Sequence, residues 1–99
     1  MSVDINNVQE LLKKDNAEVL DVRETNEFRE DGYIEGVRHT PMSDFDVDTL
    51  NLDKDKTYYI MCRSGKRSAH IAEYMEQNGY EAFNLEGGIN GYNGEKLFK

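Results

Sequence analysis

The sequence predicts an α/β fold in which helices cover both faces of a central parallel sheet. Short apolar runs typical of buried strands alternate along the chain with segments whose apolar residues recur at helical spacing. Hydrophobic residues make up 37% of the chain and charged residues 32%, which is typical of a compact fold and not of a disordered chain. With 99 residues, we expect a single domain, 1–99, that folds alone as a monomer.

The N-terminal part predicts a helix and then a buried strand. Apolar residues between Ile5 and Leu12 fit one helix face, and Asp4 is placed to cap its N-terminus. Residues 17–22 are mostly apolar, which suits a strand in the middle of a parallel sheet.

Charged residues crowd the carboxyl end of that strand, where Asp21, Arg23 and Glu24 follow one another closely. Such carboxylates could act in acid/base catalysis. We favour a pair between Asp21 and Arg23 that fixes the following turn.

A short helix over 26–30 is expected next, and Gly32 should end it because glycine accepts a left-handed C-cap. Residues 37–40 predict a brief strand, and Pro41 ends its pairing because proline has no N–H to donate. Residues 42–55 are acidic, polar and weakly patterned, so we expect a connector with at most one short helix.

The clearest pattern is a strand followed by a helix around the one cysteine. Residues 57–61 are β-branched and aromatic, which predicts a strand. A helix should then run to about Gln77, ending at Asn78-Gly79. Its core-facing residues, at helical spacing, are Ser68, Ile71, Ala72 and Met75. Cys62 therefore lies on a strand-to-helix turn.

The C-terminal part predicts a strand over 82–85, a glycine pair and a final helical turn with a tail over 89–98. Gly87-Gly88 could cradle a phosphate, but no glycine-rich nucleotide motif or P-loop lysine follows. We favour close passage of this segment against another backbone.

The segment from Cys62 to Ser68 combines a nucleophile with the features of an anion site. Gly65 and three cations follow the cysteine within five residues: Arg63, Lys66 and Arg67. The amides of such a turn, the N-terminus of the next helix and the cations all favour an anion. The same field stabilises a thiolate, so the pKa of Cys62 should lie below the usual value of about 8.5. The cations could also be only a solvated face, but the neighbouring cysteine and glycine favour the anion site.

The two histidines are poorly placed for catalysis. His39 could act as a base for Cys62, but a thiolate held in a cationic loop needs none, so a structural or exposed role is favoured. His70 falls opposite the apolar stripe of its helix and should be solvated.

Cys62 and Arg67 enclose four residues, and this loop resembles the active-site loop of the rhodanese sulfurtransferases. Two further blocks extend the resemblance in the family's order. Residues 20–24, 27–28 and 32–37 with Pro41 resemble the stretch after the family's second strand, and 85–89 resemble its closing segment. Tyr33 and Tyr92 stand where many members carry histidine and tryptophan, and we expect both to pack and not to react.

The resemblance implies a small three-layer rhodanese-like fold with about five short strands and sulfurtransferase activity without a cofactor. The Cys62 thiolate would take the outer sulfur of an anionic donor such as thiosulfate, hold it as a persulfide and pass it to an acceptor such as cyanide or a thiol. A protein could also donate or accept the persulfide. The implied substrate-binding residues are Arg63, Ser64, Gly65, Lys66, Arg67 and Ser68. Among them, Arg67 is expected to brace the loop.

Two other functions remain open. A phosphatase or arsenate reductase also uses a cysteine and an arginine, but its loop holds five residues between them, whereas Cys62 and Arg67 enclose four. A non-enzymatic relay or redox-sensing module could use the same thiol. No second cysteine is available to resolve an oxidised Cys62, which weakens the sensor hypothesis.

The composition limits the classes of partner and metal that we expect. A net charge of −8 disfavours nucleic acid and anionic membranes as partners. One cysteine and two histidines are too few for a structural zinc site, so no metal is expected. No signal peptide or membrane span is predicted, and a free thiol fits a reducing cytoplasm.

Overall fold

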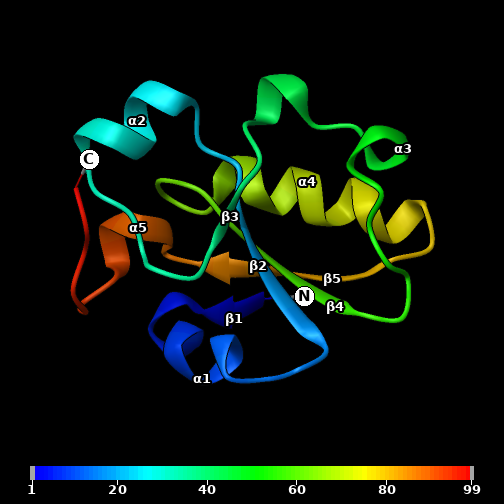
Figure 1. The fold of residues 1–99 in the computed structure, drawn as a ribbon, viewed down its shortest axis with the longest axis horizontal. Helices are drawn as coiled ribbons and strands as arrows, with labels where there is room; N and C mark the ends of the chain where they lie inside the picture. The colour runs from blue at the N-terminus through cyan, green and yellow to red at the C-terminus, as the bar shows by residue number, and fades with distance from the viewer. Residues whose placement is uncertain (1, 99) are drawn as a thin grey trace.

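The computed structural model describes residues 2–98 and contains a five-stranded sheet in which all neighbouring strands are parallel (Figure 1). The strands are ordered β1-β5-β4-β2-β3, so β4 lies at the centre. Their bounds in chain order are β1 (Ser2–Asp4), β2 (Ala17–Asp21), β3 (Arg38–His39), β4 (Thr57–Met61) and β5 (Glu81–Glu86).

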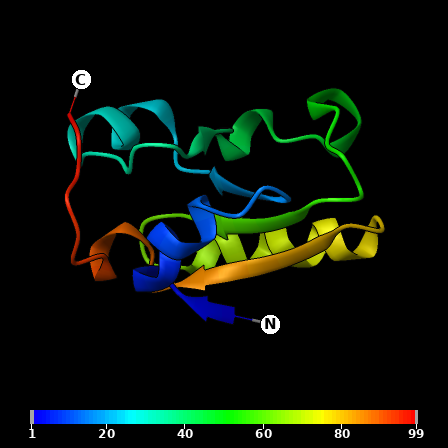
Figure 2. The same ribbon diagram turned by 60° about the horizontal axis from the view of Figure 1, so that its bottom comes forward.

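The described part of the chain contains seven helices or helical turns, of which six connect strands and the last, α5, follows β5. They are η1 (Ile5–Asn7), α1 (Val8–Leu12), α2 (Thr25–Glu30), η2 (Met42–Asp44), α3 (Val47–Leu50), α4 (Lys66–Gln77) and α5 (Gly88–Gly91). The longest, α4, has 12 residues and packs along β5 (Figure 2). Within residues 2–98, none of the helices has the length and apolar character needed to cross a membrane.

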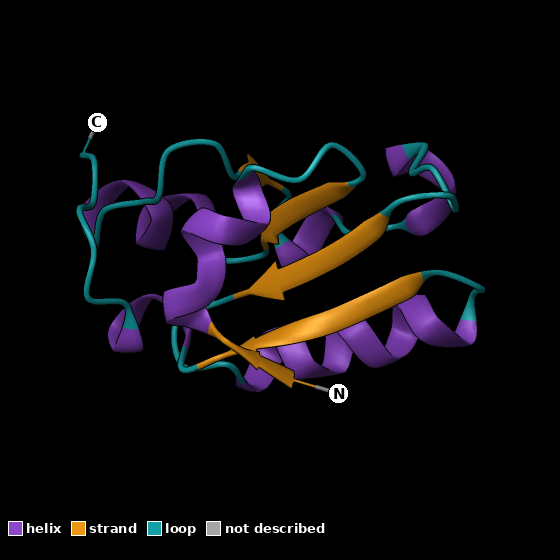
Figure 3. Ribbon diagram, turned by 90° about the horizontal axis from the view of Figure 1, so that it is seen from below, coloured by secondary structure: helices purple, strands orange, loops and turns teal. Residues whose placement is uncertain are grey.

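The sheet separates two apolar cores, because side chains point alternately to its two faces. Tyr59 and Met61 of β4 belong to a core that includes Val8 of α1. Tyr58 and Ile60 belong to the opposite core, which includes the apolar stripe of α4. Figure 3 shows α1 in front of the sheet and α4 behind it. The three-layer α/β fold with about five short strands is therefore confirmed.

Most predicted elements are confirmed with small shifts at their ends. The predicted strand over 82–85 extends to Glu81–Glu86, and the predicted helix over 26–30 begins one residue earlier, at Thr25. The Asp4 carboxylate does cap the first helical segment, accepting the Asn6 N–H at 2.8 Å, but that segment divides into η1 and α1.

Two regions differ from the prediction. Strand β1 was not predicted, because Ser2–Asp4 has no apolar run and is a strand only through its pairing with β5, where Val3 lies opposite Leu85. The expectation of at most one short helix in 42–55 is wrong, since both η2 and α3 lie there. Local capping explains α3: the Asp46 carboxylate accepts the Asp48 N–H at 2.9 Å.

The predicted pair between Asp21 and Arg23 is confirmed as an ion pair with no exposed side-chain surface. Arg23 Nε and Nη2 lie 3.0 Å and 2.8 Å from oxygens of Asp21. Nη2 also donates to the Gly32 carbonyl at 2.9 Å, and Gly32 has a φ of +82°. These bonds hold both ends of the segment that carries α2. This agrees with the prediction that the pair fixes the turn after β2.

Candidate active site in the loop after the central strand

Cys62 is the first residue after β4. From β2 the chain continues to β3 on one side of the sheet, whereas from β4 it continues to β5 on the other. The carboxyl end of β4 is thus near the point where connections diverge, which is where ligands bind in open α/β sheets. Residues 63–65 then lead directly into α4, so the predicted strand-to-helix turn is confirmed.

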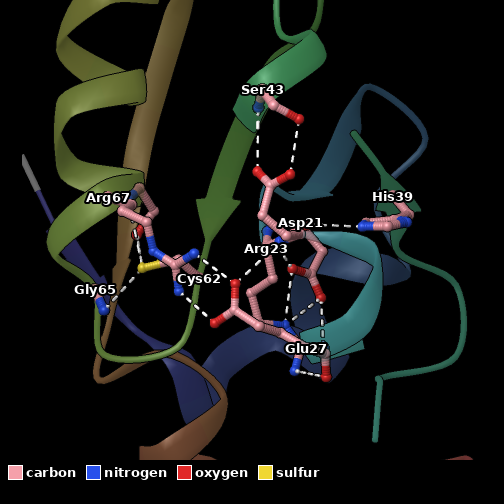
Figure 4. Close-up of polar contacts among 10 residues, drawn as sticks. Asp21, Arg23, Glu27, His39, Ser43, Cys62, Gly65 and Arg67 are labelled. Carbon is pink, nitrogen blue, oxygen red and sulfur yellow. Dashed lines mark hydrogen bonds and ion pairs between the residues drawn. The ribbon is translucent and has the colours of Figure 1, made fainter. Parts of the chain in front are cut away.

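Three hydrogen-bond donors converge on the sulfur of Cys62 (Figure 4). The Gly65 N–H donates to Sγ at 3.1 Å and the Ser68 N–H at 3.4 Å, while the Ser68 hydroxyl oxygen lies 3.3 Å away. Gly65 adopts a left-handed conformation with φ +99°, which glycine accepts without strain. The Ser68 N–H lies in the first turn of α4, where amides lack a carbonyl of their own helix.

These donors favour the thiolate. Burial raises the pKa of Cys62, but hydrogen bonds from the Ser68 hydroxyl and from the amides of Ser68, Gly65 and Ser64 lower it by more. The net pKa lies below the ordinary value for a thiol, as the sequence predicted. Cys62 has no exposed surface, so water does not compete for these bonds. The causes that lower this pKa are hydrogen bonds, whereas the sequence pointed equally to the loop cations.

Arg67 is held by an acidic residue of α2. Its Nη1 and Nη2 lie 2.6 Å and 2.8 Å from the two carboxylate oxygens of Glu27 (Figure 4). The hydrogen bond from Arg67 is the main cause that lowers the pKa of Glu27 to about 2, and the same bond raises the pKa of Arg67. This bidentate pair ties the start of α4 to α2. The geometry agrees with the expected bracing role of Arg67.

Glu27 is itself positioned by the start of its helix. It forms a capping box with Glu24, whose N–H donates to Glu27 Oε1 at 3.1 Å. The Glu24 carboxylate also accepts the Ser43 hydroxyl at 2.7 Å and the Ser43 N–H at 3.1 Å. A chain of contacts therefore connects η2, α2 and the cysteine loop.

The other predicted loop residues face solvent. Arg63, Ser64 and Lys66 are exposed, and neither Arg63 nor Lys66 forms an ion pair with any residue between 2 and 98. Their charges are therefore available to an anion that approaches the loop. In the same range, no three His, Cys, Asp or Glu side chains are grouped so that they could hold a metal ion.

The backbone of the loop rests on the start of α5. The Ile89 N–H donates to the Cys62 carbonyl at 2.9 Å, and the Asn90 N–H donates to the Arg63 carbonyl at 3.0 Å. A β-carbon on Gly88 would collide with both carbonyl oxygens, and Gly88 has a φ of +55°. The predicted close approach at Gly87-Gly88 is confirmed, and the neighbouring backbone is that of the cysteine loop.

Both histidines lie where structural or solvated roles were expected. His39 Nε2 is 2.7 Å from the Arg23 carbonyl, and its ring stacks on Phe28 with centroids 4.1 Å apart. His70 is exposed on α4. Tyr33 also stacks on Phe28, with the two ring centroids 4.6 Å apart. Tyr92 is buried, so both tyrosines pack as expected.

Comparison with known families agrees with this geometry. The family model described as a Rhodanese-like domain matches residues 4–95. The chain belongs to this family. The resemblance read from the sequence is therefore confirmed at the level of the family.

Individual relatives point to the transferase class. The chain is 40% identical over 77 residues to YtwF of Bacillus subtilis, whose name provisionally calls it a sulfurtransferase; the match covers 78% of this chain and 74% of YtwF. It is 33% identical over 82 residues to a sulfurtransferase of Allochromatium vinosum, covering 82% and 76% of the two chains. The match to YqhL of Bacillus subtilis, 38% identical, covers 80% of this chain but only 63% of YqhL.

A solved structure shares the whole fold. The rhodanese-like domain protein of Staphylococcus aureus superposes with a TM-score of 0.85 at 33% identity, covering 99% of this chain and 97% of that one. The alignment includes all five strands described above because it leaves almost none of the chain unmatched.

Two residues that support the loop, Glu27 and Asn84, have no role assigned from the sequence. Gly88 was noticed as half of a glycine pair, although its neighbour was unknown. The spacing of Glu24 and Glu27 is that of a capping box, but nothing local indicates that Arg67, 40 residues later, is the partner of Glu27. Asn84 carries no recognisable signal.

Proposed function

We propose that this chain is a sulfurtransferase that carries a sulfane sulfur as a persulfide on Cys62. The observation that supports this most directly is the convergence of the Gly65 and Ser68 donors on a buried sulfur. Such donors favour a thiolate nucleophile, and they suit an anionic adduct in the same place.

In the first half of the proposed reaction, the Cys62 thiolate attacks the outer sulfur of thiosulfate. A bond forms between Sγ and that sulfur, the sulfur–sulfur bond of thiosulfate breaks, and sulfite leaves with the bonding electron pair. No external oxidant or reductant is needed. The exposed cations Arg63 and Lys66 would attract the dianionic donor.

In the second half, a thiophilic acceptor such as cyanide attacks the outer sulfur of the persulfide. The new carbon–sulfur bond forms as the bond between the outer sulfur and Sγ breaks. Thiocyanate leaves as the product, and Cys62 returns to the thiolate form. The lowered pKa of Cys62 makes it a good leaving group at this step.

Phosphatase chemistry is less well supported. There the arginine that closes the loop would have to bind the phosphate oxygens, but both terminal nitrogens of Arg67 are engaged by Glu27. The proposal therefore assigns Arg67 to the loop and not to the substrate.

The intact mass of the protein tests the proposal. After incubation with thiosulfate and removal of the excess, we expect a gain of one sulfur atom that disappears on addition of cyanide, with thiocyanate released. The Cys62→Ser variant, once circular dichroism has shown that it is folded, should gain no sulfur and show no turnover. Loading from a protein persulfide but not from thiosulfate would instead favour a relay function. Turnover that survives in Cys62→Ser, or a free thiol that accepts sulfur from no sulfane donor, would overturn the proposal.

A further inference from the structure

The hydroxyl group of Ser68 lies between two polar groups that it cannot serve at once. Its oxygen is 3.3 Å from Cys62 Sγ and 2.6 Å from Asn84 Oδ1. A serine hydroxyl has one proton to donate and two lone pairs that can accept. When Ser68 donates to Asn84, it can only accept from a protonated Cys62. When it donates to a Cys62 thiolate, Asn84 Oδ1 loses its donor.

Asn84 lies on β5, next to the cysteine loop. It projects from β5 and is only 8% exposed. Its Nδ2 lies 3.7 Å from the position that a β-carbon on Gly65 would occupy, so the amide sits beneath the loop. The residue also lines a cavity of about 210 Å³ together with residues of β1 and α4, including Ala69 and Ala72.

Rotation of the Asn84 amide resolves the conflict at Ser68. With Oδ1 toward Ser68, as in the structure, the amide accepts the hydroxyl proton. Turned by half a rotation, the amide presents Nδ2, donates to the Ser68 oxygen and leaves the hydroxyl proton to Cys62. In the described part of the chain Nδ2 has no hydrogen-bond acceptor, so this turn exchanges one bond for another without loss.

We propose that Asn84 is a positioning residue whose amide, by turning between its two faces, directs the Ser68 hydroxyl toward Cys62 whenever the sulfur carries negative charge. This inference rests on the proposed function, in which Sγ alternates between a thiolate and the inner sulfur of a persulfide. The hydroxyl turns toward Sγ in the thiolate and back toward Asn84 when the charge moves to the outer sulfur.

The charged groups around this pair stay constant in the test. They are Arg67 with its partner Glu27, the exposed cations Arg63 and Lys66 of the loop, Glu73 and Glu76 along the cavity, and Glu86 at the end of β5. None of them is substituted, so each contributes equally to every variant.

The test is the pH dependence of Cys62 alkylation by a neutral reagent, measured in Asn84→Leu with and without Ser68→Ala. Leucine has the same branched skeleton as asparagine, with apolar methyl groups in place of the amide atoms, and would lie beside Ala69 and Ala72. Without the amide, no N–H donates to the Ser68 oxygen in the thiolate state, so the hydroxyl is less firmly directed toward Sγ and the midpoint should rise by about half a pH unit. In the Ser68→Ala background the same substitution should leave the midpoint unchanged. Asn16→Leu, at an exposed turn, controls for the substitution itself.

Asn84→Asp provides a second, independent variant. A carboxylate only accepts, so it would keep the hydroxyl proton away from Sγ and raise the midpoint by about one pH unit. The rise should be smaller in the Ser68→Ala background, where only the through-space charge remains. Equal shifts with and without Ser68, or an unchanged midpoint in Asn84→Leu, would overturn the inference. The measurement needs no sulfur donor, so its failure is distinguishable from a failure of the chain to accept sulfur from thiosulfate.

Discussion

Cys62 and Ser68 are fully buried, whereas Arg63 and Lys66, one and two residues away from them along the chain, are exposed. The buried half of the loop contacts the sulfur through backbone and hydroxyl donors. The exposed half carries full charges without ion-pair partners among residues 2–98. Arg67 lies between the halves, tied to Glu27.

The difference separates two tasks that the sequence had placed together. Hydrogen bonds in a region without water are not weakened by solvent, so they act strongly on the balance between the thiol and the thiolate of Cys62. Exposed charges are screened by salt over about 8 Å at physiological ionic strength, so they act mainly on the approach of a charged donor. We therefore expect the buried half to set the pKa of Cys62 and the exposed half to set the affinity for anions.

The largest effect on the buried half is expected from Gly88→Ala. The added methyl group collides with the carbonyls of Cys62 and Arg63 and forces alanine into a left-handed conformation. We expect the free energy of unfolding in urea to fall by about 3 kcal/mol, with loss of sulfur transfer. Gly91→Ala is the matched control in the same short helix, because its β-carbon meets Ile5 at an ordinary 3.6 Å. Equal stability of the two variants would contradict a tight fit beneath the loop.

Glu27→Gln tests the connection between the halves. Because the pKa of Glu27 is depressed from 4.5 to about 2, its charge stabilises the fold above pH 4.5, and this contribution is lost as the pH falls toward 2. We expect Glu27→Gln to lower the free energy of unfolding by about 1 kcal/mol at pH 7, after allowance for solvent screening. The difference from the unsubstituted chain should shrink as the pH is lowered through this window. A difference that stays constant from pH 7 to pH 2 would show that the carboxylate charge is not involved.

Ser68→Ala isolates the buried donors. Removing the hydroxyl takes away a hydrogen bond that favours the thiolate, so the thiol form gains and the pKa of Cys62 rises. The midpoint of alkylation against pH should move up by about one unit. Ser64→Ala, which removes an exposed hydroxyl from the other half of the same loop, should leave the midpoint unchanged. If both variants shift the midpoint equally, the distinction between the halves fails.

The smallest effect on the thiol is expected from the double substitution of Arg63 and Lys66 by alanine. Exposed charges contribute little to a buried group, so the midpoint should rise by no more than about 0.3 unit. The KM for thiosulfate should rise several-fold at low salt, and this difference should fade as salt is added. Substituting the exposed Lys13 and Lys14 by alanine changes the net charge equally and serves as the control. A midpoint shift larger than that of Ser68→Ala would place thiol control in the exposed half.

Much of the site could be predicted because its signals are local. The strand before Cys62, the helix after it and the stop at Gly79 all lie within one continuous segment, and the buried residues of α4 fall at the spacing expected. Periodicity and helix ends depend on neighbours in sequence, so they can be read without knowing the rest of the fold. The pair between Asp21 and Arg23 was accessible for the same reason, since its members are two residues apart.

The sequence by itself determined the position of the nucleophile, the turn that holds it and the α/β class of the fold. Tertiary structure decided which distant groups complete the site: Glu27 for Arg67, Asn84 for Ser68, and the start of α5 for the loop carbonyls. It also decided that Ser2–Asp4 is a strand. These contacts depend on the strand order β1-β5-β4-β2-β3, which brings β5 and α2 to the carboxyl end of β4. Strand order arises from packing between segments far apart in the chain, and local hydrophobic patterns do not encode it.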